Sequence, residues 1–517
     1  MPYMMGIDVG TTGARAIIVD ERGHLVGAAT AEYPLYTPKP LWAEQDPEDW
    51  WRASKAAIKS AIVKAGISGA EIGGVGLTGQ MHGLVLLDEK NAVLRPAILW
   101  CDGRTQEQCD WITAKVGAER LIELACNPAL TGFTAPKMVW VRQHEPEVWA
   151  RARKALLPKD YLRHRLTDEF ATEVSDASGT LLLDVRKRRW SKEMLAALDI
   201  DESILPRVYE SPVVSGNVSV QVAAETGLRA GTPVVGGGGD QAAGGVGNGI
   251  VQPGLISSTI GSSGVVFAFT EKPWIDPKGR VHTFCHAVPD RWHVMGVTLG
   301  AGLSLKWVRD ELSVAERSVA ALTGTDVYEY LTKEAAGAPA GSEGLICLPY
   351  LMGERTPHLD PNAKGVYFGL TGRHTRAHLL RSVLEGVAYS LRDSLEILKE
   401  MRVPLGEVRF SGGGGRSLLW RQIQADVFGL QGVTLNVSEG PSYGAALLAG
   451  VGTGVYASVE EACDETLGVI ERCAPVLRNV RVYDRFYPIY RALYPALKPQ
   501  FEAVTAAVAA TLPTAGA

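Results

Sequence analysis

The sequence predicts an α/β protein that is built from two large domains. Its 517 residues exceed the roughly 250–300 residues at which a single hydrophobic core stops growing. Short apolar runs that end in glycine-rich turns alternate with amphipathic runs, which is typical of strands alternating with helices. A pattern of strand, glycine-hydroxyl turn and strand near the N-terminus also recurs 251 residues later. We expect one domain over residues 1–248, a second over 249–490, and a C-terminal tail over 491–517.

The composition favours an enzyme of the cytoplasm. The net charge of −5 is spread without long runs of one sign, so we expect neither nucleic acid nor a membrane surface as a partner. No apolar run reaches the roughly 18 residues that a spanning helix needs, and the N-terminus does not show the pattern of a signal peptide. Seven cysteines without a C-x-x-C spacing indicate free thiols in a reducing compartment.

The first motif is a turn between two predicted strands, residues 3–9 and 15–20. It consists of Gly10, Thr11, Thr12 and Gly13, and successive backbone N–H groups in such a turn can hold a phosphate. Asp8 would bind Mg²⁺, usually through water, and the ion would bridge to the phosphates. Arg15 adds a positive charge beside the turn, although a surface role fits it equally well. The alternative is an ordinary hairpin with Asp8 exposed.

A second motif follows the predicted strand at residues 72–77. Met81 and His82 lie there in a glycine-bounded loop that is suited to lining a polar substrate pocket, although a single histidine is often only structural. Residues 74–79 match the dinucleotide-binding pattern G-x-G-x-x-G, which requires a helix directly afterwards. Residues 84–88 predict another strand instead, so we reject that interpretation. Residues 176–180 predict a loop near the substrate.

The third motif is a run of four glycines, residues 236–239, that leads into Asp240 and Gln241. Glycines let the backbone turn sharply and let a substrate come close. The run follows the apolar residues 233–235, so Asp240 is expected at the end of a strand that faces a crevice, where α/β proteins place their chemistry. The alternative is a flexible loop whose aspartate only caps the next helix.

The second half of the chain repeats the first turn. Residues 261–264 read Gly-Ser-Ser-Gly between two predicted strands, like the Gly-Thr-Thr-Gly of residues 10–13. This indicates two related domains that face each other and offer their turns to one anion. The glycine-rich turn at residues 412–417 precedes a helix and would admit adenine and ribose. Because no P-loop pattern occurs, we expect these turns to hold the nucleotide and its phosphates, with Gly10, Thr11, Thr12, Arg15 and Ser417 among the candidate residues.

The chain resembles the FGGY carbohydrate kinases from Asp8 to about Gly454. Six segments carry the resemblance, and they read LWAEQDP (41–47), GQMHG (79–83), PAILW (96–100), LPKDYLR (157–163), GERTPH (353–358) and WRQIQAD (420–426). The resemblance implies an α/β fold of two ribonuclease-H-like domains, of the actin and Hsp70 ATPase type, with a cleft between them. ATP and the sugar would meet in that cleft.

The resemblance also implies roles for the motif residues. Asp240 matches the catalytic base, Met81 and His82 match the sugar-binding pair, and Asp8 with the Thr11–Thr12 turn matches the Mg²⁺ and phosphate loop. Asp240 and Gln241 are further candidates for contacting the sugar. The family's nucleotide contacts match Gly261, Ser262, Gly302, Gly413 and Gly414. This sequence departs from the family at three positions. Cys101 and Gln241 each stand where asparagine is usual, which bears on the choice of sugar, and Ser262 stands where threonine is usual but keeps the hydroxyl.

The expected reaction is the transfer of phosphate from ATP to a ketose, and D-xylulose is the ketose we expect. Ribulose, xylitol and glycerol are alternative acceptors in the same family. An actin- or Hsp70-like ATPase without a sugar substrate is a further alternative, disfavoured because no peptide-binding domain follows the ATPase unit. The expected partners are the sugar and ATP, and a homodimer is compatible with the sequence.

Overall fold

The computed structural model describes residues 2–511, and within them the chain forms two compact units. The first unit comprises Met1–Pro253, Phe269–Val294 and Glu439–Gly468, and the second comprises Gly254–Ala268, Met295–Ser438 and Val469–Ala517. Neither unit is one continuous stretch of sequence. The boundary that we predict between residues 248 and 249 stays a prediction. So does the tail over 491–517, of which residues 512–517 lie outside the described part.

The first unit is organised around a mixed sheet in the order β13-β14-β5-β1-β2-β3. The first three strands form an antiparallel meander, β5 runs parallel to β1, and β15 extends the parallel side by pairing with β5. This confirms the meander predicted from the N-terminal apolar runs. The strands are β1 (Tyr3–Val9), β2 (Gly13–Val19), β3 (Leu25–Glu32), β5 (Ile72–Gly79), β13 (Val214–Asn217), β14 (Pro233–Val235) and β15 (Gly238–Gly239).

Helix α1 (Pro47–Ala65) covers one face of this sheet. The Asp46 side chain accepts a hydrogen bond from the Glu48 N–H at its start, and Gly66 ends it in the left-handed region with φ 67°, as the sequence predicts. Apolar side chains of β1, Met5 and Ile7 among them, belong to the same buried cluster as the tryptophans of α1. Burial of this face against α1 stabilises the sheet.

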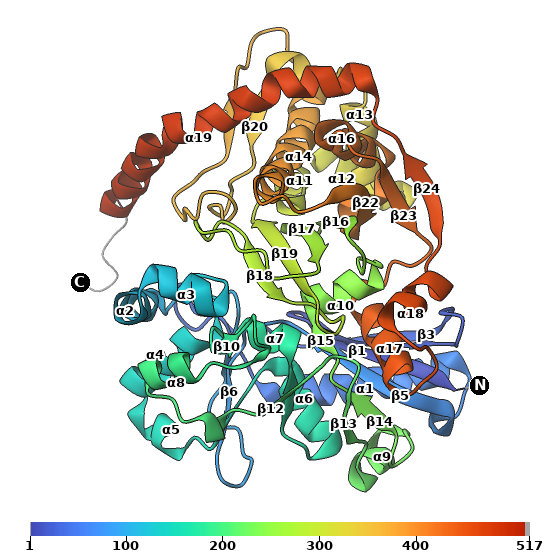
Figure 1. Ribbon diagram of the computed structural model, residues 1–517. Helices are drawn as coiled ribbons and strands as arrows, with labels where there is room; N and C mark the ends of the chain where they lie inside the picture. The colour runs from blue at the N-terminus through green and yellow to red at the C-terminus, as the bar shows by residue number, and fades with distance from the viewer. Residues whose placement is uncertain (1, 512–517) are drawn as a thin grey trace. The chain divides into compact units, whose positions relative to one another are not determined.

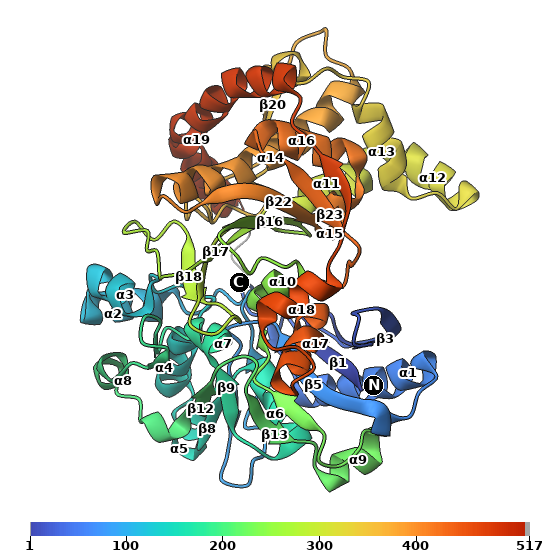
Figure 2. The same ribbon diagram turned by 45° about the vertical axis from the view of Figure 1, so that its right-hand side comes forward.

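Side chains alternate between the two faces of a strand, so the sheet also has an opposite face. Helix α17 (Gly440–Gly452) covers that face. It comes from the far end of the sequence, yet it lies beside β1 and β5 (Figure 1 and Figure 2). Glycines make this approach close: a Cβ at Gly6 would lie 1.9 Å from the Ser442 carbonyl oxygen, and one at Gly76 would lie 1.8 Å from that of Ala445. Helix α10 (Asp240–Gly247) packs on α17 in the same way, since a Cβ at Gly444 would lie 1.9 Å from the Ala243 carbonyl oxygen.

The remaining elements of the first unit surround the sheet and carry the loops that follow β5 and β15. Strand β6 follows the loop after β5, which confirms the rejection of a dinucleotide-binding turn. These elements are β4 (Glu44–Gln45), η1 (Gly69–Glu71), β6 (Val85–Leu87), β7 (Ala97–Ile98), α2 (Gln106–Val116), α3 (Ala118–Ala125), α4 (Thr134–His144), α5 (Pro146–Arg151), β8 (Lys154–Leu156), α6 (Pro158–Thr167), β9 (Ala171–Glu173), α7 (Val174–Ser178), β10 (Leu183–Asp184), β11 (Arg189–Trp190), α8 (Lys192–Leu198), η2 (Glu202–Ile204), β12 (Arg207–Tyr209), α9 (Val220–Thr226), β18 (His282–Cys285) and α18 (Val459–Thr466).

The second unit repeats the pattern of the first. Strands β16 (Gly254–Ile260) and β17 (Gly264–Thr270) form an antiparallel hairpin, and β22 (Leu405–Ser411) pairs with β16 in parallel, as β5 pairs with β1. The shared topology confirms two related α/β domains of the ribonuclease-H-like type. The other elements are β19 (Trp292–Thr298), α11 (Gly302–Leu312), α12 (Val314–Thr323), α13 (Val327–Ala335), η3 (Ser342–Gly344), β20 (Ile346–Leu348), β21 (Val366–Phe368), α14 (Arg376–Glu400), α15 (Gly412–Arg416), α16 (Leu418–Phe428), β23 (Gly432–Leu435), β24 (Val469–Cys473) and α19 (Leu477–Thr511).

Among the helices of residues 2–511, none combines the length and the apolar character that crossing a membrane requires.

Candidate functional site

Two half-buried carboxylates lie at one edge of the first unit's sheet. Asp8, near the end of β1, pairs in register with Thr78 of β5. On the other side of β5, Gly238 of β15 pairs with the same Thr78, and Asp240 follows β15 at the start of α10. The parallel strands therefore bring Asp8 and Asp240 to the same edge, as expected for the carboxyl ends of parallel strands.

Burial and mutual charge shift the pKa of both groups. Burial raises the pKa of Asp240 to about 6, against hydrogen bonds from the backbone and side chain of Gln241 that lower it. Burial and then the negative charge of Asp240 raise the pKa of Asp8 to about 7, with Arg15 opposing the shift. One carboxylate oxygen of Asp8, Oδ1, is buried without a hydrogen-bond partner among the protein groups described. At Asp8, burial and the negative charge of Asp240 thus outweigh the opposing charge of Arg15.

The turn after β1 is held in place by polar side chains. The Gly10 N–H donates to the Gly13 carbonyl at 3.1 Å, and the Thr11 carbonyl accepts from Gln45 Nε2 at 2.7 Å. The Thr11 hydroxyl donates to Gln80 Oε1 at 3.3 Å and accepts from Trp100 Nε1 at 3.0 Å. Sequence reasoning missed this support, which comes from three separate segments.

The other predicted residues of this turn have different surroundings. The Thr12 side chain is exposed. Arg15 donates to Thr30 Oγ1 at 2.9 Å and forms an ion pair with Glu439 at 2.5 Å. Its charge is therefore partly compensated within the protein, a partner that the sequence alone did not reveal.

Met81 and His82 lie beside the strand that leads to Asp240. A Cβ at Gly239 would lie 2.9 Å from Met81 Cγ, so only glycine fits beside this methionine. His82 has a left-handed backbone with φ 69°, and its Nδ1 lies 2.7 Å from the Gly179 carbonyl oxygen. A fully buried lysine, Lys137, donates to the His82 carbonyl at 2.9 Å. The structure thus brings Met81, His82 and Asp240 into one neighbourhood.

In the second unit, the predicted nucleotide residues gather around the end of β16. The Gly302 N–H donates to the Gly261 carbonyl at 2.9 Å, and the Leu303 N–H donates to the Ser262 carbonyl at 3.0 Å. A Cβ at Gly414 would lie 2.6 Å from the Cβ of Ile260, the last residue of β16. The turn at residues 261–263, the start of α11 and the glycines of α15 therefore form one group of closely packed main-chain segments.

Ser417 and Glu354 stabilise two main-chain segments of the second unit. Ser417 caps helix α16, because its Oγ accepts the Trp420 N–H at 3.3 Å. Glu354 was not predicted: it accepts from Thr298 Oγ1 at 2.5 Å and from the Leu299 N–H at 2.9 Å, and burial raises its pKa to about 7. Glu354 thereby holds the segment that leads to Gly302.

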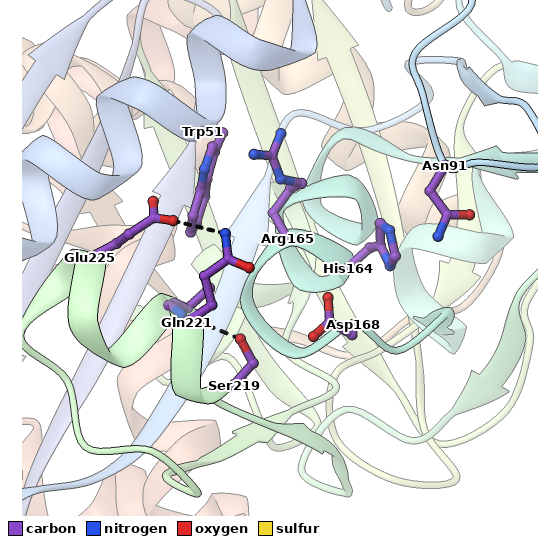
Figure 3. A pocket seen from close by; sticks show the side chains of 9 residues that line it. Trp51, Asn91, His164, Arg165, Asp168, Ser219, Gln221 and Glu225 are labelled. Atoms are coloured by element: carbon purple, nitrogen blue, oxygen red, sulfur yellow. Dashed lines mark hydrogen bonds between the residues drawn. The ribbon is translucent and has the colours of Figure 1, made fainter.

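A separate hollow of about 500 Å³ on the first unit contains none of the predicted site residues (Figure 3). Its lining is polar and includes Trp51, Arg165, Gln221 and Glu225. Gln221 Nε2 donates to Glu225 Oε1 at 3.2 Å across one turn of α9, and the Arg165 guanidinium lies 5.1 Å from the centre of the Trp51 ring. We assign no role to this hollow.

Comparisons with known proteins agree with these observations. Residues 3–247 match the N-terminal domain model of the FGGY family of carbohydrate kinases, and residues 256–453 match its C-terminal domain model. The chain is 42% identical over 496 residues to a xylulose kinase of Escherichia coli strain K12, covering 96% of this chain and 99% of that protein. It is 39% identical over 494 residues to a xylulose kinase of Bacillus subtilis strain 168, covering 96% and 97% respectively.

A solved structure of a xylulose kinase from Rhodospirillum rubrum superposes with a TM-score of 0.87 at 31% identity, covering 97% of this chain and all of that one. These matches confirm the two-domain kinase fold and an ATP-dependent transfer of phosphate to a carbohydrate. The chain belongs to the FGGY family of carbohydrate kinases.

Proposed function

We propose that this enzyme transfers the γ-phosphoryl group of ATP to D-xylulose and releases D-xylulose 5-phosphate and ADP. The observation that carries the proposal is the half-buried Asp240 carboxylate at the sheet edge, with Met81 packed against the strand that leads to it. Xylulose kinases at about 40% identity over nearly the whole chain support the choice of ketose.

Asp240 is the proposed general base. With a pKa of about 6, it is ionised at neutral pH and still basic enough to accept a proton. The sugar hydroxyl oxygen forms a bond to the γ-phosphorus, the bond from that phosphorus to the ADP oxygen breaks, and the hydroxyl proton passes to Asp240. Phosphoryl transfer needs little covalent help from the protein beyond this. Met81, His82 and Gln241 would hold the ketose in place.

Asp8 fits a site for Mg²⁺. Its Oδ1 is buried without a partner among the described groups, and the charge of Asp240 raises its pKa, so a cation would relieve both costs. Residues 2–511 contain no group of three or more histidine, cysteine or acidic side chains placed so that they could hold a metal ion together. One carboxylate completed by water and phosphate oxygens is a usual arrangement for Mg²⁺. When bound, the ion would offset the charge of the phosphates.

The proposed nucleotide contacts lie on the glycine-hydroxyl turns and the glycine-rich helix starts. In the first unit they are Gly10, Thr11, Thr12 and Arg15, and in the second they are Gly261, Ser262, Gly302, Gly413, Gly414 and Ser417. Backbone N–H groups in such turns suit phosphates, and the absence of side chains at glycine lets the nucleotide come close to the main chain.

The test is a coupled assay of ADP release across D-xylulose, D-ribulose, L-ribulose, glycerol and xylitol. We expect the highest kcat/KM with D-xylulose. A higher value with another acceptor would reassign the substrate within the family. ATP hydrolysis that no sugar stimulates would favour an ATPase without a sugar substrate.

The role of Asp240 is tested by Asp240→Asn. We expect kcat to fall by about 10²- to 10⁴-fold, the usual contribution of a general base, while calorimetry shows that D-xylulose still binds. Asp168→Asn is the matched control: Asp168 is exposed with φ 62°, a backbone conformation that asparagine tolerates well. Near-normal turnover of Asp240→Asn would contradict the role of Asp240 as general base.

A cytoplasmic location and a homodimer belong to the same proposal. The structure has all seven cysteines as free thiols, which supports a reducing compartment. Light scattering after size-exclusion chromatography measures the assembly.

A further inference from the structure

The four glycines before Asp240 raise a physical problem for a catalytic carboxylate. Glycine has more backbone freedom than any other residue, so residues 236–239 cannot hold the next side chain in one place by their own conformational preferences. A general base must nevertheless stay within a few tenths of an ångström of its working position. The segment therefore needs groups from elsewhere that fix its main chain.

The first such group is Ser175, on helix α7. Its Oγ accepts the Gly239 N–H at 3.1 Å, directly before Asp240, and donates to Glu173 Oε1 at 3.0 Å. Both serine and glutamate are fully buried. Since Oγ bridges the two, the position of Gly239 depends on where Glu173 holds this hydroxyl.

Glu173 is itself held by several donors. Its carboxylate accepts the Ser175 N–H at 2.7 Å, the Asp176 N–H at 2.8 Å and the Ser211 hydroxyl at 3.0 Å. The fully buried Lys159 ammonium lies 3.7 Å from Glu173 Oε1. A carboxylate with this many hydrogen-bond donors around it is held rigidly in place.

The same segment is also fixed at its other end. Arg163 of α6, which is fully buried, donates to the Val235 carbonyl at 2.7 Å and to the Gly236 carbonyl at 2.6 Å. The Gly237 N–H donates to the Ser211 carbonyl at 2.8 Å. The pairing of β15 with β5 also holds Gly238 and Gly239, and Ser175 adds a side-chain acceptor to the Gly239 N–H, next to Asp240.

We propose that Ser175, held by Glu173, is a positioning residue that fixes the main chain at Gly239 and thereby places the Asp240 carboxylate for proton transfer. Ser175 is fully buried, and its proposed effect on the reaction is exerted through Gly239. The inference rests on the proposed role of Asp240 as general base.

The experiment compares Ser175→Ala with Ser178→Ala. Both serines lie in α7 and are buried, with 0% and 1% exposure, but the Ser178 hydroxyl donates to the Val174 carbonyl at 2.7 Å and accepts the Cys285 N–H at 3.1 Å. Neither of these bonds reaches residues 236–239, so Ser178→Ala controls for a lost buried hydroxyl in the same helix.

For Ser175→Ala we expect kcat to fall about 10- to 100-fold, the size of effect that a small misplacement of a catalytic group produces. KM for D-xylulose should change less than about twofold, and Ser178→Ala should retain kcat within about twofold of the wild type. Hydrogen exchange of the peptide over residues 238–242 should be faster in Ser175→Ala only. Equal kcat values for the two variants would overturn the proposal.

Two outcomes separate this inference from the proposed function. If the wild type phosphorylates no ketose, the proposed function fails, and hydrogen exchange alone decides whether Ser175 fixes the segment. If Ser175→Ala does not fold, Ser175→Cys replaces it, since sulfur is a weak acceptor of similar size. That variant should show the same direction of change in kcat and exchange, and wild-type values in both would overturn the proposal.

Discussion

Replacing Asp240 by asparagine should make the first unit more stable at neutral pH while it removes activity. The folded protein keeps a carboxylate that burial disfavours, because the pKa of Asp240 is raised from 3.8 to about 6. Between these two values the folded state binds more protons than the unfolded state, so the stability falls as the pH rises through this window. Asparagine carries no charge, so its burial does not lower the stability of the folded state in this way.

The expected gain in the free energy of unfolding follows from the size of the pKa shift of Asp240. A displacement of about two pKa units corresponds to about 3 kcal/mol at pH 7 and above, since each unit is worth about 1.4 kcal/mol. Partial access of solvent to this residue reduces the gain, and we expect about 2 kcal/mol. Asp8 adds to the gain, because its own pKa is raised partly by the charge of Asp240. Below about pH 4 the difference should disappear.

The assay is urea unfolding of wild type and Asp240→Asn at pH 7.5 and at pH 4, in buffer without divalent cations. Tryptophan fluorescence reports mainly on the first unit, which contains ten of the twelve tryptophans. A variant that is no more stable than the wild type at pH 7.5 would refute the reasoning. So would a stability difference that is the same at both pH values.

The same pKa also predicts the acid limb of activity. Because the base must be ionised, kcat/KM of the wild type should be half-maximal near pH 6 and fall about tenfold for each further pH unit below it. A profile that stays flat down to pH 5 would contradict the assignment of Asp240.

Two further variants test the supports of the site. Lys137→Met should raise KM for D-xylulose about tenfold with little change in kcat, because the Lys137 ammonium donates to the His82 carbonyl at 2.9 Å; steady-state kinetics measures this, and an unchanged KM would contradict it. Gly300→Ala should lower the melting temperature and weaken ATP binding about tenfold or more, because its Cβ would lie 1.7 Å from the Pro349 carbonyl oxygen. Gly372→Ala is its control, since a Cβ there would meet nothing within 4 Å, and equal effects of the two would argue against the steric explanation.

Much of the fold could be predicted because its signals are local. The hairpin tips at residues 10–13 and 261–264 combine glycines with hydroxyls between apolar runs, and the boundaries of α1 follow from Asp46 and Gly66. The approach of Asp8 and Asp240 to one edge could be inferred as well, since Asp8 lies near the end of one predicted strand and Asp240 follows another.

The remaining features depend on partners that are distant in the sequence. Helix α7 was predicted as a loop near residues 176–180, because its N-terminal N–H groups are satisfied by Glu173 and not by one of the usual capping residues. The support of Thr11 comes from Gln45, Gln80 and Trp100. No local pattern marks such contacts, and the same holds for the ion pair of Arg15 with Glu439.

The discontinuity of the first unit has a consequence for biosynthesis. Strands β1 and β5 carry Gly6 and Gly76 on the face that α17 covers closely, and α17 emerges from the ribosome roughly 190 residues after Pro253. At translation speeds of about 5–20 residues per second, the nascent N-terminal half waits for about 10–40 seconds before α17 arrives. Until then, the face of β1 and β5 that carries Gly6 and Gly76 stays uncovered, and we expect chaperones to bind the nascent chain there.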